Sequence, residues 1–442
     1  MNRGDQDDQG LTLVTFAYIL QNRDRLAASG TPIYRLGTQG GASQAVAVSL
    51  ESVLVLSPQE QAALEFALPR RWVERHVFPR ALDLDAPPDE ASPSRWVGLL
   101  DLTPRERIRE LIKCREQFEI QRKQVSNPGE RAAVLAEVAV AAFEINRASM
   151  SLEKAGATAE EVLLVKETKA IIKSVVEMMA EPELGRALFD LLRRPSLDFT
   201  YRHTIRVFST MVGFLLYYQE SHARGIFQRV RLAFKDRHRS IYRRLLPAVS
   251  EGALTADNVV RLSALSIPQI RVYALGALLH DLGRVFDLDH GEGLGTADPR
   301  RVHRHPILGS GLFLRTYGLE HEEARYIVGD HHNQLFHPDG YGLTRWERNN
   351  GRRVYPAYQC CITDSLSDFT AGQALGFFPV EVCGLVDLFD GLTHPDSGEG
   401  LTVNAALDKL REEALIHGKV DPILVDLFTD YLHSLRIAPP PP

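Results

Sequence analysis

The chain has 442 residues, 44% of them apolar and 24% charged, which is enough for two or three domains with substantial cores. Its formal net charge of -6 disfavours nucleic-acid binding through bulk electrostatics. No apolar run reaches the ~20 residues of a membrane-spanning helix, and no signal peptide is recognisable, so we expect a cytoplasmic protein.

The N-terminal part predicts a small α+β domain over 1–100, with a sensory or docking role of unknown type. We expect a helix over 11–29, then two short strands in the segments PIYRLG and AVAVSLESVLVLS, with a glycine-containing turn between them. Ser57 is a plausible N-cap for a second helix. Residues 80–97 are rich in proline and aspartate, which is typical of a linker or long loop.

From Thr103 onward the pattern is helical almost to the end of the chain, and 101–159 is predicted to be a helical linker. Thr103 suits an N-cap, and Pro104 follows at the first helical position. An Asn-Pro-Gly-Glu break falls at 127–130. The next segment repeats apolar residues every three or four positions, as an amphipathic helix does: Val162, Val165, Ile171, Ile172, Val175, Met178 and Met179. The region 103–180 is either a signalling bundle or an oligomerising stalk, and a homodimer is one expected assembly.

Residues 222–245 form a basic segment with eight Arg or Lys and one acidic residue, Asp236. Apolar residues are interleaved at helical spacing, so the first interpretation is a helix with a solvated basic face. The alternative is a surface that binds an anionic ligand, nucleic acid, or an acidic partner or signalling domain.

The four cysteines form no Cys-x-x-Cys pair, so neither a zinc ribbon nor a disulfide framework is indicated. The neighbours Cys360 and Cys361 are expected to be buried packing residues, because free cysteine usually behaves as a small apolar group.

Histidine is unevenly distributed, since fourteen of the fifteen lie at or after position 203. Five short stretches in this half contain residue types that ligate metals: His203, the pair His280-Asp281, His305, the pair His331-His332, and Asp387. Neighbours on a helix point about 100° apart, so a His-Asp pair can serve two metals. A carboxylate can bridge them because it has two oxygens. Five such stretches in one helical region are hard to explain by packing.

The His280-Asp281 pair resembles the defining motif of the HD phosphohydrolases. The ordered set, with HDLGR, HPILG and VDLFDGLTH, resembles the HD-GYP family of cyclic-di-GMP phosphodiesterases. The resemblance covers 160–436 and implies a mainly α chain. In it, a C-terminal all-α HD-type helical domain over 160–436 has a metal site in its core, and the helical linker and the small N-terminal α+β domain precede it.

The resemblance also implies two divalent metal ions, iron or manganese. One would be held by His203, His280, Asp281 and Asp387, and the second by Asp281, His305, His331 and His332. Asp364 is a rival for Asp387, which is preferred because its flanking residues match the family's final motif better. Asp281 and Arg284 would act in catalysis, and Arg284 and Tyr341 would contact the substrate. The metals would activate a bridging water or hydroxide that attacks phosphorus in line.

Several recognition elements differ from the family's pattern. Arg284 replaces a lysine, Asn333 replaces a glutamate, and the Gly-Tyr-Pro signature is reduced to Gly340-Tyr341-Gly342. Phe199 stands where some members have a third-metal glutamate, and HPDSGEG replaces an Arg-Pro-Tyr stretch. The leading hypothesis is hydrolysis of a cyclic dinucleotide, cyclic-di-GMP first of all. The alternatives are a catalytically weak or inactive HD-GYP-like signalling protein that binds nucleotide or partner domains, and a phosphohydrolase of another nucleotide.

Overall fold

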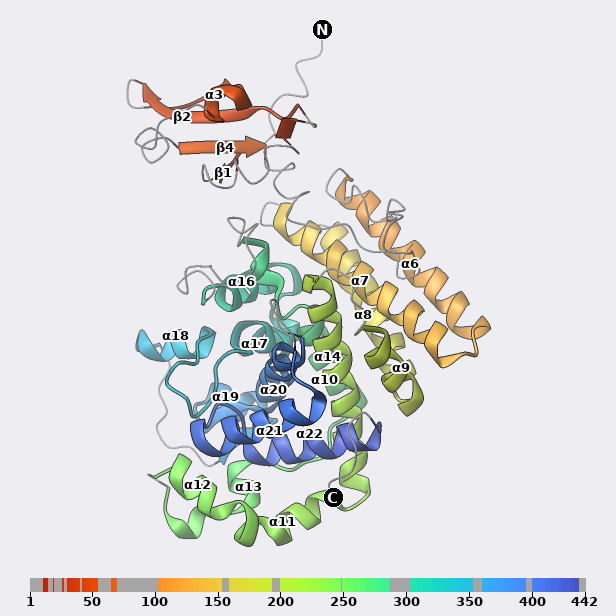
Figure 1. Ribbon diagram of the computed structural model, residues 1–442, viewed down its shortest axis with the longest axis vertical. Helices are drawn as coiled ribbons and strands as arrows, with labels where there is room; N and C mark the ends of the chain where they lie inside the picture. Colours follow the sequence, from red (N-terminus) through yellow and green to blue (C-terminus); the bar gives the residue numbers. More distant parts are fainter. Residues whose placement is uncertain are drawn as a thin grey trace.

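The computed structural model describes residues 11–14, 19, 26–27, 30–39, 42–54, 65–69, 102–152, 159–192, 199–247, 249–286, 303–352, 360–394 and 400–436. Figure 1 shows a sheet at the N-terminal end and helices through the rest of the chain, so the prediction of a mainly α protein is confirmed. The predicted cap at Ser57, the linker at 80–97 and most of the HPDSGEG segment lie outside the described residues.

The N-terminal sheet has four antiparallel strands in the order β1-β4-β2-β3, accompanied by the short helix α3. The elements are β1 (Leu11–Val14), β2 (Ile33–Gln39), β3 (Ala42–Val48), α3 (Leu50–Leu54) and β4 (Glu65–Pro69). The hairpin β2–β3 confirms the first predicted strand and the start of the second. The second was wrong after Val48, because Leu50–Leu54 form the helix α3. The helix expected over 11–29 was wrong at its start, and the helix expected after Ser57 was wrong at its end. Both segments form strands instead: β1 pairs with β4, and Leu11 lies opposite Pro69. Such long-range strand pairing overrides local helical preference.

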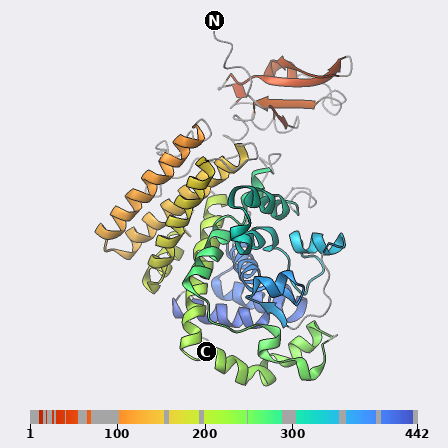
Figure 2. The ribbon, with the colours of Figure 1, turned by 180° about the vertical axis from the view of Figure 1, so that it is seen from behind.

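Four helices follow the sheet and pack side by side along one flank of the molecule, as Figures 1 and 2 show from opposite sides. They are α6 (Pro104–Gln124), α7 (Pro128–Leu152), α8 (Ala159–Met179) and α9 (Pro182–Leu192). Thr103 caps α6 as predicted, in a reciprocal capping box with Glu106. The apolar face predicted for α8 is buried from Ile171 onward, but Val162 is 67% exposed. The four helices thus form a packed bundle.

The remaining helices surround α10, which contacts α9, α14, α20 and α22. They are α10 (Phe199–Ala223), α11 (Ile226–Arg237), α12 (Arg239–Leu245), α13 (Ala256–Val259), α14 (Ile267–Leu278), the 3₁₀ segment η3 (Leu282–Phe286), α16 (His305–Tyr317), α17 (Glu322–Asp330), α18 (Leu343–Asn349), α19 (Leu366–Thr370), α20 (Phe378–Thr393), α21 (Val403–Glu412), the π-helical turn η5 (Glu413–His417) and α22 (Pro422–Ser434). Short 3₁₀ turns η2 (Glu251–Ala253) and η4 (Leu319–His321) and the parallel strands β5 (Cys360–Thr363) and β6 (Ala374–Phe377) complete this part. One core runs through it from Ile108 to Leu435, so α6 and α7 share a core with the helices that follow. The domain boundaries drawn from the sequence remain predictions.

The basic segment 222–245 is not one helix. Gly225, with φ 70°, separates α10 from α11, and His238 separates α11 from α12. Ion pairs within the chain engage Arg231 with Asp257 and Arg237 with Asp426. Part of its positive charge is therefore neutralised internally.

Four buried cysteines are free thiols, as the packing interpretation of Cys360 and Cys361 predicts. Burial raises the pKa of the Cys361 thiol, which opposes formation of the reactive thiolate. Among the described helices, none is both long and apolar enough to cross a lipid bilayer.

Candidate metal centre

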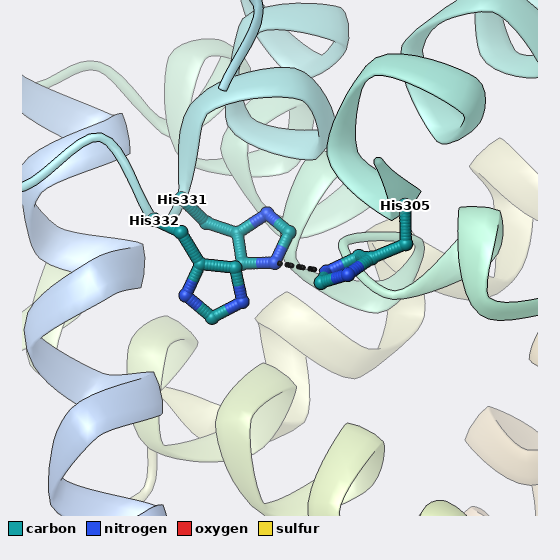
Figure 3. A group of neighbouring side chains, drawn as sticks. All are labelled: His305, His331 and His332. Atoms are coloured by element: carbon teal, nitrogen blue, oxygen red, sulfur yellow. Dashed lines mark hydrogen bonds between the residues drawn. The ribbon is translucent and has the colours of Figure 1, made fainter. Parts of the chain in front are cut away.

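Five elements bring the predicted ligand residues to one place in the core. His203 comes from α10, and His280 and Asp281 follow the end of α14. His305 begins α16, while His331 caps the end of α17 and His332 follows it. Figure 3 shows His331 and His332 side by side, with His305 facing them from α16. Two groups of these side chains could hold a metal ion: His203, His280 and Asp281, and His305, His331 and His332.

Asp281 lies between the two groups, with one carboxylate oxygen toward each. Its Oδ2 is 3.5 Å from Nε2 of His203 and 3.7 Å from Nε2 of His280. Its Oδ1 is 3.3 Å from Nε2 of His305 and 3.7 Å from Nε2 of His331. This is the position that the sequence predicted for a bridging carboxylate.

Close backbone packing between η3 and α16 places His305 opposite Asp281. A Cβ added at Gly283 would lie 1.8 Å from the backbone oxygen of His305 and 2.7 Å from the backbone nitrogen of Gly309. Any larger residue at this position would therefore push α16 away. The glycine of the HDLGR motif therefore allows η3 and α16 to pack closely enough for His305 to face Asp281.

Hydrogen bonds on the outer side of the imidazoles fix their orientation. Nδ1 of His280 donates to the carbonyl of Ala277 at 2.9 Å, and Nδ1 of His331 donates to the carbonyl of Val328 at 3.1 Å. A proton on Nδ1 leaves a lone pair on Nε2, and that lone pair points to the centre of the site. Metal-ligating histidines in proteins are held in the same way.

The atoms facing the centre repel one another unless a cation or proton lies among them. Nε2 of His280 is 3.4 Å from Nε2 of His203, and Nε2 of His305 is 3.2 Å from Nε2 of His331. Both oxygens of Asp281 are shielded from solvent and accept no hydrogen bond from any residue that the structure describes. Arg284 lies 2.8 Å from Oδ1 and balances part of its charge, while Oδ2 faces His203 and His280. A buried carboxylate that accepts no hydrogen bond is costly, so these residues fit a metal centre.

Protonation states follow from burial and the neighbouring charges. Burial lowers the pKa of His280 and of His305 to about 4, so both are neutral ligands near pH 7. Burial raises the pKa of Asp281, but Arg284 and the nearby imidazoles lower it by more, to well below its usual range. Burial also lowers the pKa of His203, but Asp387 and Asp390 raise it to about 10. Without a cation in the site His203 carries a proton, which a metal would displace.

Asp387 lies at the cluster and its rival Asp364 does not. Oδ1 of Asp387 is 3.1 Å from Nε2 of His203, and Oδ2 is 3.5 Å from Nδ1 of His332. Asp364 instead accepts a hydrogen bond of 2.5 Å from the hydroxyl of Ser263. The geometry favours Asp387 and shows one departure from the predicted grouping, because Asp387 reaches toward both sets of histidines.

Asp390 and Arg206 were missed by the sequence reasoning. Nδ1 of His203 donates to Oδ2 of Asp390 at 2.8 Å, and Arg206 binds both oxygens of that carboxylate. Arg206 lies one turn after His203 on α10, and Asp390 lies one turn after Asp387 on α20. A search for charged residues one helical turn from each ligand would have found both.

The two predicted substrate contacts both lie beside the ligands. Nε of Arg284 is 2.8 Å from Oδ1 of Asp281, out of line for a hydrogen bond, and its side chain is 21% exposed. The ring of Tyr341 lies 4.7 Å from that of His332 and 4.1 Å from that of His303, centroid to centroid. Tyr341 thus packs on His332, a predicted ligand. His337 lies in the loop between His332 and Tyr341.

A cavity of about 340 Å³ opens next to the ligands. Its wall includes Arg284, His332 and Asp387 at the metal end, and Gln334, Glu381 and Lys419 beyond them. Burial, with Asp421 and Asp330 nearby, raises the pKa of Glu381 to about 8, so this carboxyl group is mainly protonated near pH 7. The site therefore combines a carboxylate-rich end with a wall that bears one neutral acid and one lysine.

Comparisons with protein-family models, with curated proteins and with solved structures found no match to this chain.

Proposed function

We propose that this chain is a metal-dependent phosphodiesterase with an HD-type domain, acting on a cyclic dinucleotide such as cyclic-di-GMP. The observation that carries the proposal is the position of Asp281. Its two buried oxygens face separate histidine groups, and they accept no hydrogen bond from the described residues. A carboxylate so placed suits two cations that share it, and mixed imidazole and carboxylate donors suit iron or manganese.

Metal ions bound here would act as Lewis acids and lower the pKa of a bound water. The chain's own residues orient the reactants. His203, His280 and Asp387 form one wall, and His305, His331 and His332 form the other. Arg284, which lines the cavity beside Asp281, would neutralise charge that develops on a phosphate oxygen.

The proposed reaction consumes one water molecule and needs no oxidant or reductant. The water oxygen forms a new bond to phosphorus while one ester P–O bond of the ring breaks. The leaving ester oxygen takes up a proton, and the product is a linear dinucleotide with a terminal phosphate. Further hydrolysis at the same site would give mononucleotides.

The test is elemental analysis of the purified protein together with hydrolysis of cyclic-di-GMP. We expect bound iron or manganese in the native protein, and loss of both metal and hydrolysis in His280→Ala. The exposed His222 provides the control, since His222→Ala should change neither. A metal-loaded protein that leaves cyclic-di-GMP and its mixed-base relatives intact would contradict the proposal. If it bound them tightly without turnover, the result would favour a signalling protein that senses the nucleotide.

A further inference from the structure

The wall of the cavity beyond the metal ligands contains a lysine that the metal centre does not use. Among the described residues that line the cavity, the Lys and Arg side chains are Arg284 and Lys419. Arg284 already contacts Asp281. Lys419 comes from the turn between η5 and α22, 138 residues after Asp281, and its side chain is 29% exposed.

A tight turn directs Lys419 toward the cavity. The π-helical turn η5 ends at Gly418, which adopts φ 66°. A Cβ there would lie 2.8 Å from Cβ of Phe336 and 2.9 Å from Cδ2 of Leu245, so glycine suits this position for both conformation and space. The amide of Lys419 then donates to the carbonyl of Glu413. The turn that leads into this lysine is therefore fixed.

The carboxylate of Glu413 forms ion pairs with two lysines, Lys419 and Lys409. Oε2 of Glu413 is 3.1 Å from Nζ of Lys419, and Oε1 is 3.5 Å from Nζ of Lys409. Glu413 is 10% exposed, whereas Lys409 is 37% exposed and also pairs with Glu412. Lys419 is thus a positioned, partly accessible cation at the edge of the cavity.

We infer that Lys419 is a specificity-determining residue that binds the second phosphate of a substrate whose first phosphate lies at the metal ligands. This inference rests on the proposed function. A cyclic dinucleotide contains two phosphodiesters in one ring, and only one of them is cleaved at a time. The other loses part of its hydration on binding and requires a cation nearby. A lysine serves as a point charge for a phosphate oxygen.

The test compares two substrates on the purified, metal-loaded protein: cyclic-di-GMP, with two phosphates, and bis(p-nitrophenyl) phosphate, with one. Lys419→Met removes the charge and keeps most of the length. Because a hydrogen bond to a charged group contributes enough to change affinity about tenfold, the ratio of kcat/KM for cyclic-di-GMP to that for the one-phosphate diester should fall about tenfold. Lys419→Arg, which keeps the charge, should retain most of the ratio.

Lys409 is the matched control, because it contacts the same Glu413 but does not line the cavity. Lys409→Ala should keep the native ratio. An unchanged ratio in Lys419→Met, or an equal fall in Lys409→Ala, would overturn the role of Lys419. If the native protein cleaves the one-phosphate diester but not cyclic-di-GMP, the proposed substrate itself is wrong, which is a different result.

Discussion

Largely buried carboxyl groups in two parts of the site ionise in opposite ways: Asp281 and Asp387 lie among the predicted ligands, and Glu381 lies on the wall of the adjacent cavity. Burial raises the pKa of Asp281 and of Asp387. Arg284 and the nearby histidines nevertheless lower the pKa of Asp281, and His203 and His332 lower that of Asp387, to below the usual range. On the wall, burial raises the pKa of Glu381 to about 8, and its acidic neighbours Asp421 and Asp330 add to the effect. Neighbouring charges, rather than the depth of burial, therefore decide which of these carboxyl groups is ionised, and only the ionised group suits the proposed cations.

The strongest way to break this comparison is to remove the central charge. Asp281→Asn keeps the shape but cannot balance two cations, so we expect loss of bound metal and a fall in kcat of roughly 10³-fold or more. Metal content and hydrolysis of cyclic-di-GMP measure both effects. Asp364→Asn is the control, since Asp364 binds Ser263 away from the ligands. Native metal content in Asp281→Asn would contradict the bridging role.

The second prediction concerns Glu381, the protonated carboxyl group on the cavity wall. Glu381 has a raised pKa in the folded state, so it contributes stability that is full below its ordinary value of 4.5 and is lost as the pH rises to about 8. The free energy of unfolding of the native protein, relative to that of Glu381→Gln, should fall by on the order of 4 kcal/mol across this range. Urea unfolding at a series of pH values measures this difference. If the free energies of unfolding of the native protein and of Glu381→Gln changed in parallel with pH, the prediction would be refuted.

The third prediction separates the two halves of the metal end. Gly283→Ala forces a Cβ against the backbone of His305, and we expect the free energy of unfolding to fall by about 3 kcal/mol, with a loss of metal affinity. A Cβ added at Gly311 on α16 would meet no atom within 4 Å, so Gly311→Ala is the matched control and should leave metal affinity unchanged. Equal behaviour of the two variants would show that the close approach is unimportant.

The smallest expected effect tests the support of His203. Asp390→Asn weakens the hydrogen bond that orients this ligand and should lower metal affinity by about 10- to 100-fold, leaving the fold intact. Competition with a fluorescent chelator measures the affinity, and circular dichroism checks the fold. Full native affinity would mean that Asp390 serves only its ion pair with Arg206.

Local chemistry made part of this structure predictable from the sequence. Thr103 and Pro104 begin α6 because capping depends on neighbouring residues only, and the ligand types were visible because each falls in a short helical stretch. Strand pairing was not predictable, since Leu11 finds its partner at Pro69. Lys419 was not predictable either, because the turn that carries it reaches the cavity only after the helices have packed, whereas Asp390 could have been found one helical turn after Asp387.

The contact between His203 and Asp390 joins residues that are 187 positions apart. Closing so long a loop costs entropy, and the contact cannot form until nearly the whole helical part has been synthesised and folded. A metal bound there would act as a cross-link between α10 and α20. Removing it should therefore lower the unfolding temperature of the entire helical part in one step, because ligand binding to the folded state alone stabilises the whole cooperative unit.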